Sequence, residues 1–145
     1  HTNTAIGAVT RLQDMGVEPF LLSSSLVAVM AQRLVRLLCT DCRELCDATP
    51  TEREILGVEG DEQVQIYHAK GCAKCNMTGY RGRTGIYELI EVDEELRTAI
   101  HEGEGEQAML AVARKQYPGI QADGRRRILA GETTLEEVLR VTSVT

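Results

Sequence analysis

The sequence predicts an α+β protein that is mostly α-helical with short β-strands. One Phe, four Tyr and no Trp among 145 residues argue against an aromatic-rich β-sandwich. Apolar residues recur at helical spacing in several segments, which Gly and Pro separate. Two Cys-x2-Cys pairs indicate a small subdomain organised around a metal ion. With 43% hydrophobic residues, the chain is long enough to bury a core.

The first helix is predicted between Thr4 and Met15, where apolar residues follow one another at three-residue steps. Gly16 can end this helix, and Pro19 is suited to the start of a second one. We expect the second helix to run from about Phe20 to Leu38. Its expected buried side is formed by Leu22, Leu26, Val29 or Met30, Leu34 and Leu37. Two helices enclose little core, so we expect them to pack on a β-sheet formed by residues upstream of this chain.

The strongest signal is the pair of motifs Cys39-Thr40-Asp41-Cys42 and Cys72-Ala73-Lys74-Cys75, with 29 residues between them. The four thiolates of Cys39, Cys42, Cys72 and Cys75 can converge on one tetrahedral metal ion, and zinc is the ion that such a set favours. Four protein ligands close the coordination shell, so the site is predicted to be structural. Ordinary reduced thiols, a redox couple or an iron–sulfur cluster are the alternatives.

Several residues near the motifs could modify the site. Three basic residues are close to the cysteines in the sequence: Arg43, Lys70 and Lys74. They could offset the negative charge of four thiolates, or they could simply be exposed to solvent. Cys46 does not fit the paired spacing, but it could replace a ligand in a damaged site. His68 could be a further ligand, although four cysteines already complete the set, and we therefore interpret it as a histidine on the face of a strand.

Between and after the motifs, the sequence predicts one short helix and two strands. The segment Thr49-Pro50-Thr51-Glu52 has the pattern of a capping box, and it predicts a helix that ends at Gly57. Alternating residues from Val64 to His68 predict a strand that leads to the second motif. Residues 76–85 contain three glycines and predict a loop before a strand from Ile86 to Val92. Such a loop could approach a phosphate, but we favour a tight connection from the metal site to the strand.

The remaining residues predict a small helical domain. Asp93 is positioned to cap a helix, which the Gly-Glu-Gly sequence of residues 103–105 breaks. A second helix follows up to Tyr117, and a third spans about residues 121–130. The segment Thr133-Thr134-Leu135-Glu136 is interpreted as a second capping box that opens the final helix.

Charge and composition limit the function of the chain. A formal net charge of −6 disfavours a dedicated nucleic-acid binder, although Arg125-Arg126-Arg127 keeps this function open. The most apolar stretch, residues 20–39, contains three serines and two arginines, and it is therefore not expected to span a membrane. The first residues carry no export signal and the paired thiols need to stay reduced, so we expect a reducing compartment.

Five features occur together in this chain: residues 1–5, residues 32–36 before the first cysteine pair, the two cysteine pairs, residues 79–88 and residues 129–138. In this order they resemble the bacterial secretion ATPases, the family that includes the E-proteins of type II secretion systems and the type IV pilus assembly ATPases. The resemblance covers nearly the whole chain and is closest to the C-terminal part of a type II secretion E-protein. Because the chain opens on His1 without an initiating methionine, we expect it to be the C-terminal part of a longer protein.

The resemblance implies an ATP-driven motor that powers pseudopilus assembly and protein export by the type II secretion system. Such a motor is a cytoplasmic homo-hexamer that binds ATP and Mg²⁺, besides the Zn²⁺ indicated by the cysteines. It lies peripherally on the inner membrane through secretion-platform proteins, with no direct membrane contact and no nucleic acid. Residues 1–38 would be the C-terminal end of a RecA-like ATPase core. Residues 39–78 would be the tetracysteine zinc-binding subdomain, and residues 79–145 a connecting strand and the C-terminal helical domain.

Two nucleotide roles follow from the resemblance alone. His1 matches the histidine box of the family, whose imidazole lies near the γ-phosphate, and Arg83 matches an arginine that approaches the nucleotide. The phosphate loop Gly-x4-Gly-Lys-Ser/Thr does not occur in these 145 residues, so the fragment alone is expected to be inactive as an ATPase. We expect zinc to fasten residues 39–75 into a rigid strut between the motor core and the final helical domain.

A non-enzymatic zinc-binding interaction module is the alternative function. The second cysteine motif and the glycines after it are similar to the zinc repeats of DnaJ-type chaperones, and Arg125 to Arg127 could contact nucleic acid. Those chaperones need several such repeats, however, and an acidic chain binds a phosphate backbone poorly. A redox protein is a further possibility, which two readily formed disulfides in the metal-free, folded protein would support.

Overall fold

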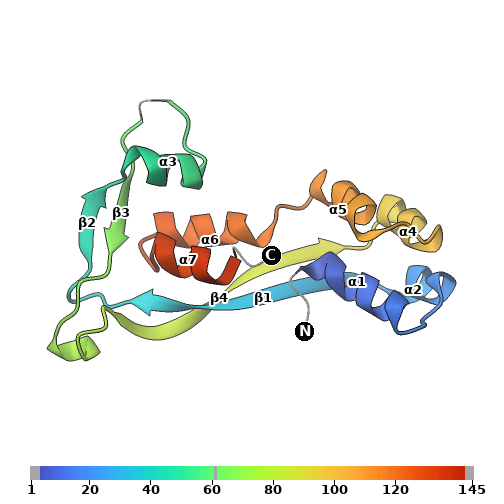
Figure 1. Ribbon diagram of the computed structural model, residues 1–145, viewed down its shortest axis with the longest axis horizontal. Coiled ribbons are helices and arrows are strands. Elements are labelled where there is room, and N and C mark those ends of the chain that lie inside the picture. Colours follow the sequence, from blue (N-terminus) through green and yellow to red (C-terminus); the bar gives the residue numbers. More distant parts are fainter. Residues whose placement is uncertain (1–3, 61, 143–145) are drawn as a thin grey trace. The chain divides into compact units, whose positions relative to one another are not determined.

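The computed structural model describes residues 4–60 and 62–142, and the chain divides into two compact units. Unit 1 comprises His1–Gln32 and Tyr87–Ile120, and unit 2 comprises Arg33–Ile86 and Gln121–Thr145. The described residues form seven α-helices, one 3₁₀-helix and four strands (Figure 1). The predicted α+β class is therefore confirmed, although residues 28–38 and 44–47 form strands that the sequence does not predict, and the strand predicted from Ile86 already begins at Tyr80.

The elements follow one another in a simple order along the chain. They are α1 (Ala5–Asp14), α2 (Pro19–Ser25), β1 (Ala28–Leu38), β2 (Glu44–Asp47), α3 (Pro50–Leu56), β3 (Gln65–His68), the 3₁₀-helix η1 (Ala73–Cys75), β4 (Tyr80–Glu91), α4 (Glu94–His101), α5 (Glu106–Arg114), α6 (Ile120–Leu129) and α7 (Leu135–Thr142).

The long strands β1 and β4 pair with each other, and the residues of each strand are shared between the two units. In unit 1, the N–H of Val92 donates to the carbonyl of Val27 at 2.9 Å. In unit 2, the N–H of Cys39 donates to the carbonyl of Gly79, also at 2.9 Å. Val27 is thus bonded to Val92 and Cys39 to Gly79, so the residue numbers rise along one strand as they fall along the other. The two strands are therefore antiparallel.

The helix expected from about Phe20 to Leu38 is wrong beyond Ser25, where α2 ends and β1 follows shortly after. The hydroxyls of Ser23 and Ser24 donate to the carbonyl of Phe20, and such bonds weaken a helix. Burial then alternates along β1, with Val29, Ala31 and Val35 buried and Met30 and Leu34 exposed by 57% and 49%. The sequence conceals this alternation because the exposed face of the strand is itself apolar.

The core of unit 1 lies among α1, α2, α4, α5 and the parts of the long strands that belong to this unit. Its buried members are Ala5, Ile6, Val9, Leu22, Val29, Ala31, Ile90, Val92, Leu96, Ala99, Ile100, Met109 and Ala113. Side-chain oxygens of Thr4 and Asp93 cap α1 and α4. The predicted first helix and the predicted pair of helices after Asp93 are confirmed.

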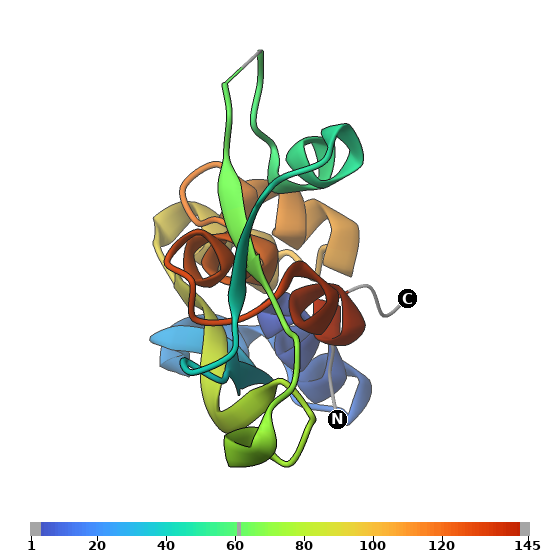
Figure 2. The ribbon, with the colours of Figure 1, turned by 90° about the vertical axis from the view of Figure 1, so that its left-hand side faces the viewer.

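In unit 2, residues 39–78 form a segment that we call the cysteine arm, which contains β2, α3, β3 and both cysteine motifs. Strands β2 and β3 lie side by side and antiparallel, with Glu44 opposite His68 (Figure 2). The predicted capping box is confirmed, because Thr49 and Glu52 each accept a bond from the backbone N–H of the other. Helix α3 ends at Gly57 as predicted, with a φ of +72°.

The loop predicted over residues 76–85 is shorter than expected, because β4 already begins at Tyr80. Positive φ angles at Asn76, Met77 and Gly79 turn the chain directly from the second cysteine motif into the strand. The structure thus has the tight connection that the sequence favoured. Arg83 consequently lies on β4, where it is exposed, rather than on a loop.

Helices α6 and α7 complete unit 2, and the predicted second capping box is shifted by one residue. Thr134, rather than Thr133, accepts the N–H of Glu137 at 3.2 Å. The hydroxyl of Thr133 donates instead to the carbonyl of Arg36 at 2.7 Å. The Glu137 carboxylate binds the N–H and guanidinium of Arg36, so it does not return to the cap as in a full capping box.

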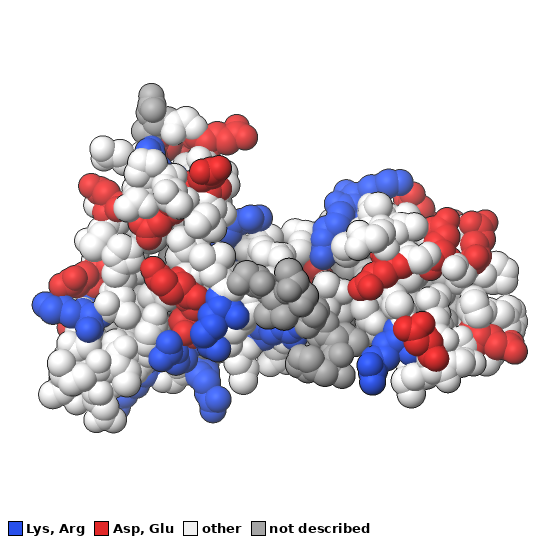
Figure 3. All heavy atoms as spheres, viewed as in Figure 1, with Lys and Arg blue, Asp and Glu red and all other residues white. Residues whose placement is uncertain are grey.

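Charge is distributed unevenly between the units. Unit 1 holds ten acidic residues against four Lys or Arg, whereas unit 2 holds twelve of each, so the whole formal charge of −6 belongs to unit 1. In Figure 3, acidic side chains crowd the surface over α4 and α5, while both signs are mixed on the cysteine arm. Across residues 4–60 and 62–142, every helix is too short or too polar to cross a membrane.

Candidate metal centre

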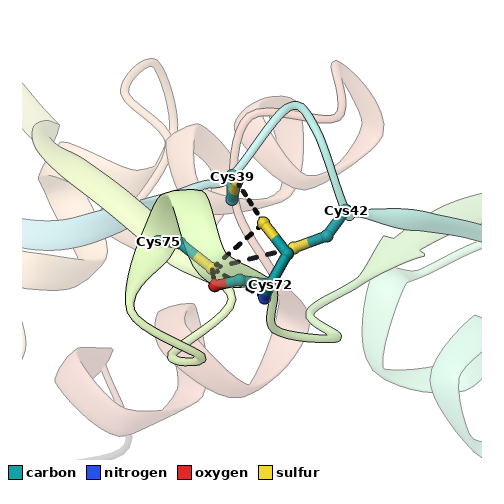
Figure 4. A group of neighbouring side chains, drawn as sticks. All are labelled: Cys39, Cys42, Cys72 and Cys75. Carbon is teal, nitrogen blue, oxygen red and sulfur yellow. Dashed lines mark hydrogen bonds between the residues drawn. The ribbon is translucent and has the colours of Figure 1, made fainter.

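The two cysteine motifs of the arm meet at one point in unit 2 (Figure 4). Cys39 directly follows β1, and Cys42 lies in the turn that leads to β2. Cys72 and Cys75 lie at the start and the end of the turn that contains η1. Because β2 and β3 are antiparallel, the 29 residues between Cys42 and Cys72 lead the chain back to its starting point. This explains how two motifs so distant in sequence come together.

The sulfur atoms have the spacing of a tetrahedral zinc site. Neighbouring Sγ atoms are 3.8 Å apart in the pairs Cys39–Cys72, Cys42–Cys75 and Cys72–Cys75, and all four lie within 4.8 Å of one another. Four Zn–S bonds of about 2.3 Å give a tetrahedron with an edge of about 3.8 Å. Disulfides have S–S distances near 2 Å, so the four cysteines are free thiols brought into a metal-binding arrangement.

Backbone N–H groups stabilise the sulfur atoms of both motifs. Cys75 accepts bonds from the N–H groups of Cys72 and Gly79, both at 3.2 Å, and Cys42 accepts one from Gly71 at 3.4 Å. Burial raises the pKa of Cys75, but the N–H donors outweigh it and lower the pKa to about 6. Burial dominates at Cys42 and raises its pKa to about 11. A divalent cation bound at this point would hold both groups as thiolates.

The three cations expected beside the ligands have contacts with other groups. Lys70 pairs with Glu44 at 3.2 Å and Lys74 pairs with Asp41 at 3.3 Å, in exposed positions. The guanidinium of Arg43 lies 4.0 Å above the ring of Tyr67 and donates to the carbonyl of Gly131 at 2.7 Å. Arg43 therefore connects the cysteine arm to the turn between α6 and α7.

Cys46 and His68 lie apart from the group of four cysteines. Cys46 is in β2, where its thiol donates to the carbonyl of Glu44 at 3.8 Å. Nε2 of His68 is 3.2 Å from a carboxylate oxygen of Glu52, so this histidine faces α3. A bond from the N–H of Thr49, together with the bond to His68, lowers the pKa of Glu52. The interpretation of His68 as a strand-face residue agrees with this contact.

Two residues are predicted to contact the nucleotide, His1 and Arg83. His1 is outside the described residues. Arg83 is an exposed residue of β4, where its side chain is accessible to a ligand. Neither role is tested by the geometry, and both stay predictions from the resemblance.

Sequence reasoning missed two glycines that shape the metal centre. Gly71 and Gly79 have φ angles of +115° and +85°, and each donates its N–H to a cysteine sulfur. A Cβ at Gly71 would lie 2.7 Å from the carbonyl oxygen of Met77, and one at Gly79 would lie 2.7 Å from Cβ of Ala69. In the sequence, the two glycines can be recognised by their positions: Gly71 directly precedes Cys72, and Gly79 follows Cys75 by four residues.

We expect Gly79→Ala to weaken zinc binding and to destabilise unit 2 by about 1–3 kcal/mol, because both the φ angle and the contact with Ala69 must change. Urea unfolding and competition with a chromophoric zinc chelator measure the two effects. Gly82→Ala is the matched control, since Gly82 has a φ of +84° and its nearest neighbouring atom would be 3.7 Å from the new Cβ. Equal losses of zinc affinity in the two variants would contradict a specific role for Gly79.

Comparisons with known proteins agree on one family. Residues 1–140 match the family model described as type II/IV secretion system protein. The chain is 57% identical to type II secretion system protein E of Aeromonas hydrophila and 55% identical to the protein of the same name from Pseudomonas aeruginosa. It is also 55% identical to type II secretion system ATPase E of Vibrio cholerae. Each alignment covers 98% of this chain and 28% of the relative, so the chain spans little more than a quarter of the length of these proteins.

Proposed function

Because the chain belongs to the family of type II/IV secretion system proteins, we propose that it is part of an ATPase that powers protein export by a type II secretion system. The observation that carries this proposal is the 55% identity, over 98% of the chain, to a relative named as an ATPase. The alignment covers 28% of that relative, which supports our proposal that the hydrolytic activity belongs to a longer protein that includes these residues.

The proposal extends to the assembly in which the protein acts. The longer protein would be a homo-hexamer that binds ATP and Mg²⁺ and drives the assembly of a pseudopilus. It would lie on the cytoplasmic side of the inner membrane, held by proteins of the secretion platform. His1, in the histidine box, would act near the γ-phosphate, and Arg83 would contact the nucleotide. The family resemblance supports these assignments, together with residues 1–38 as the end of a RecA-like core.

Within this motor, the cysteine arm would be a strut held by one structural zinc ion. Cys39, Cys42, Cys72 and Cys75 would supply all four ligands, which leaves no coordination position for a substrate. The spacing of the sulfur atoms supports this assignment. So does the contact of Arg43 with Tyr67 and Gly131, because it joins the arm to the helices at the end of the chain. A rigid arm transmits a domain movement that a flexible loop of the same length would absorb.

We expect the longer protein to hydrolyse ATP and residues 1–145 alone to show no ATPase activity, because the phosphate loop is absent from these residues. A phosphate-release assay at saturating ATP and Mg²⁺ compares the two preparations, each checked for folding by circular dichroism. Hydrolysis by residues 1–145 would contradict the assignment of catalysis to the rest of the protein. A longer protein that is folded, hexameric and inactive would contradict the proposed function itself.

A further inference from the structure

Helices α2 and α4 of unit 1 form the walls of a groove with a volume of about 400 Å³. Phe20 and two serines line it from α2, and Glu94, Arg97 and His101 line it from α4. Phe20 is 61% exposed, and its ring lies edge-on to the ring of His101, with 6.5 Å between the ring centres. The surface of the groove is mainly apolar and open to solvent, so it suits a protein segment better than an enclosed small molecule.

The two walls of the groove are fixed to each other. The guanidinium of Arg97 on α4 donates to the carbonyl of Ser23, and it donates at 3.3 Å to the carbonyl of Leu26, directly after α2. Leu22 of α2 and Ile100 of α4 are buried in the same core. The groove is therefore already formed before a ligand arrives, and binding needs little ordering of the protein.

The groove lies in the most acidic part of the chain. Residues 91–106, which include α4, contain seven Asp or Glu and one Arg, a formal charge of −6 (Figure 3). Some of these carboxylates have structural roles, because Asp93 caps α4 and Glu95 forms an ion pair. Among residues 4–60 and 62–142, Glu94 and Glu102 have no cationic partner. Glu102 also follows the last residue of α4, where the helix dipole disfavours a carboxylate, so its charge does not serve the stability of this helix.

We propose that the groove between α2 and α4 is a docking site for a cationic segment of a partner protein. An apolar side chain of the segment enters the groove beside Phe20, and Lys or Arg side chains on either side of it pair with Glu94 and Glu102. The negative charge favours this occupant over nucleic acid or an anionic lipid surface, because it repels both. This inference goes beyond the proposed function and does not depend on ATP hydrolysis.

The length of α4 sets the spacing of the cations in the partner. Eight residues separate Glu94 from Glu102, which corresponds to about 12 Å along the helix axis. In a helical partner, cations about seven residues apart lie on one face and span a similar distance. In an extended partner, the same span needs cations about four residues apart. In both cases the apolar residue lies between the two cations on the same face.

Fluorescence anisotropy with two labelled synthetic peptides tests the proposal on the longer protein. One peptide is an alanine-rich helix with two lysines seven positions apart, and the other is extended with two lysines four positions apart, each with leucine between them. At least one peptide should bind saturably at about 150 mM salt, and replacing its leucine by serine should weaken binding about 10-fold. Saturable binding of neither peptide, or equal binding of the serine peptide, would overturn the proposal.

Glu94→Gln/Glu102→Gln should weaken binding of that peptide about 5- to 10-fold, because two ion pairs at the surface are lost. The matched control is Glu54→Gln/Glu136→Gln, which makes the same change in net charge at two exposed residues of unit 2 and should retain wild-type affinity. All variants are checked for folding by circular dichroism. Equal weakening by the two double variants would reduce the interaction to the net charge of the protein and overturn the docking site.

Phe20→Ala should weaken binding about 10-fold, because the apolar side chain of the peptide loses its contact in the groove. Leu21→Ala is the control, since Leu21 is 50% exposed on the same helix but does not line the groove. Equal losses in these two variants would contradict the role of the groove. Sedimentation of the longer protein distinguishes a partner from a second copy of the chain. If Phe20→Ala lowers the oligomeric state, the groove belongs to a contact between copies, which would overturn the assignment to a cationic partner.

Discussion

Replacing Cys72 and Cys75 by serine is expected to abolish zinc binding and to unfold the cysteine arm. The purified wild-type chain should contain about one zinc ion by elemental analysis, and the double variant should contain none above background. Structural zinc contributes free energy on the order of 10 kcal/mol in small modules, far more than the short strand pair β2–β3 can supply alone. Limited proteolysis should therefore cut the variant between residues 43 and 71, and a strong chelator should make the wild-type arm equally susceptible.

The fifth cysteine provides the control for this experiment. Cys46→Ser makes the same chemical change on β2, outside the group of four sulfur atoms, and should leave zinc content and protease resistance unchanged. The Cys46→Ser change also tests whether Cys46 can replace Cys42 as a metal ligand. If Cys42→Ser retains zinc but Cys42→Ser/Cys46→Ser does not, Cys46 replaces the missing ligand. A well-ordered wild-type chain without metal would contradict the zinc assignment.

The strut hypothesis requires a second measurement with the same variant. In the longer protein, Cys72→Ser/Cys75→Ser should abolish the proposed protein export by living cells. It should affect ATP hydrolysis by the isolated protein much less, because the arm would transmit movement rather than create it. Unchanged export by cells whose protein contains no zinc would remove the strut role while leaving the metal site itself intact.

The parts of this structure that the sequence could predict are those with local determinants. The capping box at Thr49 and Glu52, the helix end at Gly57 and the cap at Asp93 each depend on side chains within four residues of one another. The four clustered cysteines belong to the same class, because each motif forms its own turn. The fold is needed only to bring the two motifs together, and the spacing of the motifs along the sequence already predicts that they meet.

The incorrect predictions concern residues whose partners are distant in sequence. The sequence predicts a helix after Ser25 in place of β1, because both faces of this strand carry apolar residues and its hydrophobic pattern therefore has no clear period. The second capping box, predicted for Thr133 and Glu136, is shifted to Thr134 and Glu137. It is incomplete because Arg36, 101 residues away, binds the Glu137 carboxylate that would otherwise return to the cap. Gly71 and Gly79 were missed since their role depends on the exact position of a sulfur atom.

Glu137 is the centre of a charged network that holds α7 in unit 2. Its side chain is 2% exposed and binds the guanidinium groups of Arg36, at 2.7 Å, and Arg140, at 3.0 Å. The backbone N–H of Arg36 adds a further bond at 2.8 Å. The Arg36 guanidinium also lies 4.1 Å above the ring of Tyr80. Burial raises the pKa of Glu137, but the bonds from Arg140 and Arg36 outweigh it and lower the pKa to about 2.

Glu137→Gln is therefore expected to destabilise unit 2 by about 3 kcal/mol at neutral pH, which is the free energy that corresponds to lowering a carboxyl pKa from 4.5 to about 2. The remaining arginines are about half exposed, so the variant leaves them hydrated rather than buried without a partner. Urea unfolding measures the change in the free energy of unfolding. The control is Glu136→Gln, the exposed neighbour on the same helix, which should change stability by less than about 0.5 kcal/mol.

The pH dependence of the same pair of proteins tests the cause. Because the pKa of Glu137 is lower in the folded chain than in the unfolded chain, its contribution is complete above about pH 4.5 and disappears as the pH falls towards 2. The stability difference between the wild type and Glu137→Gln should therefore be constant near neutrality and shrink below pH 4.5. Protonation of the cysteines releases zinc from both proteins in acid, so this loss cancels in the difference. A difference that persists undiminished at pH 2 would show that Glu137 stabilises unit 2 through its shape rather than its charge.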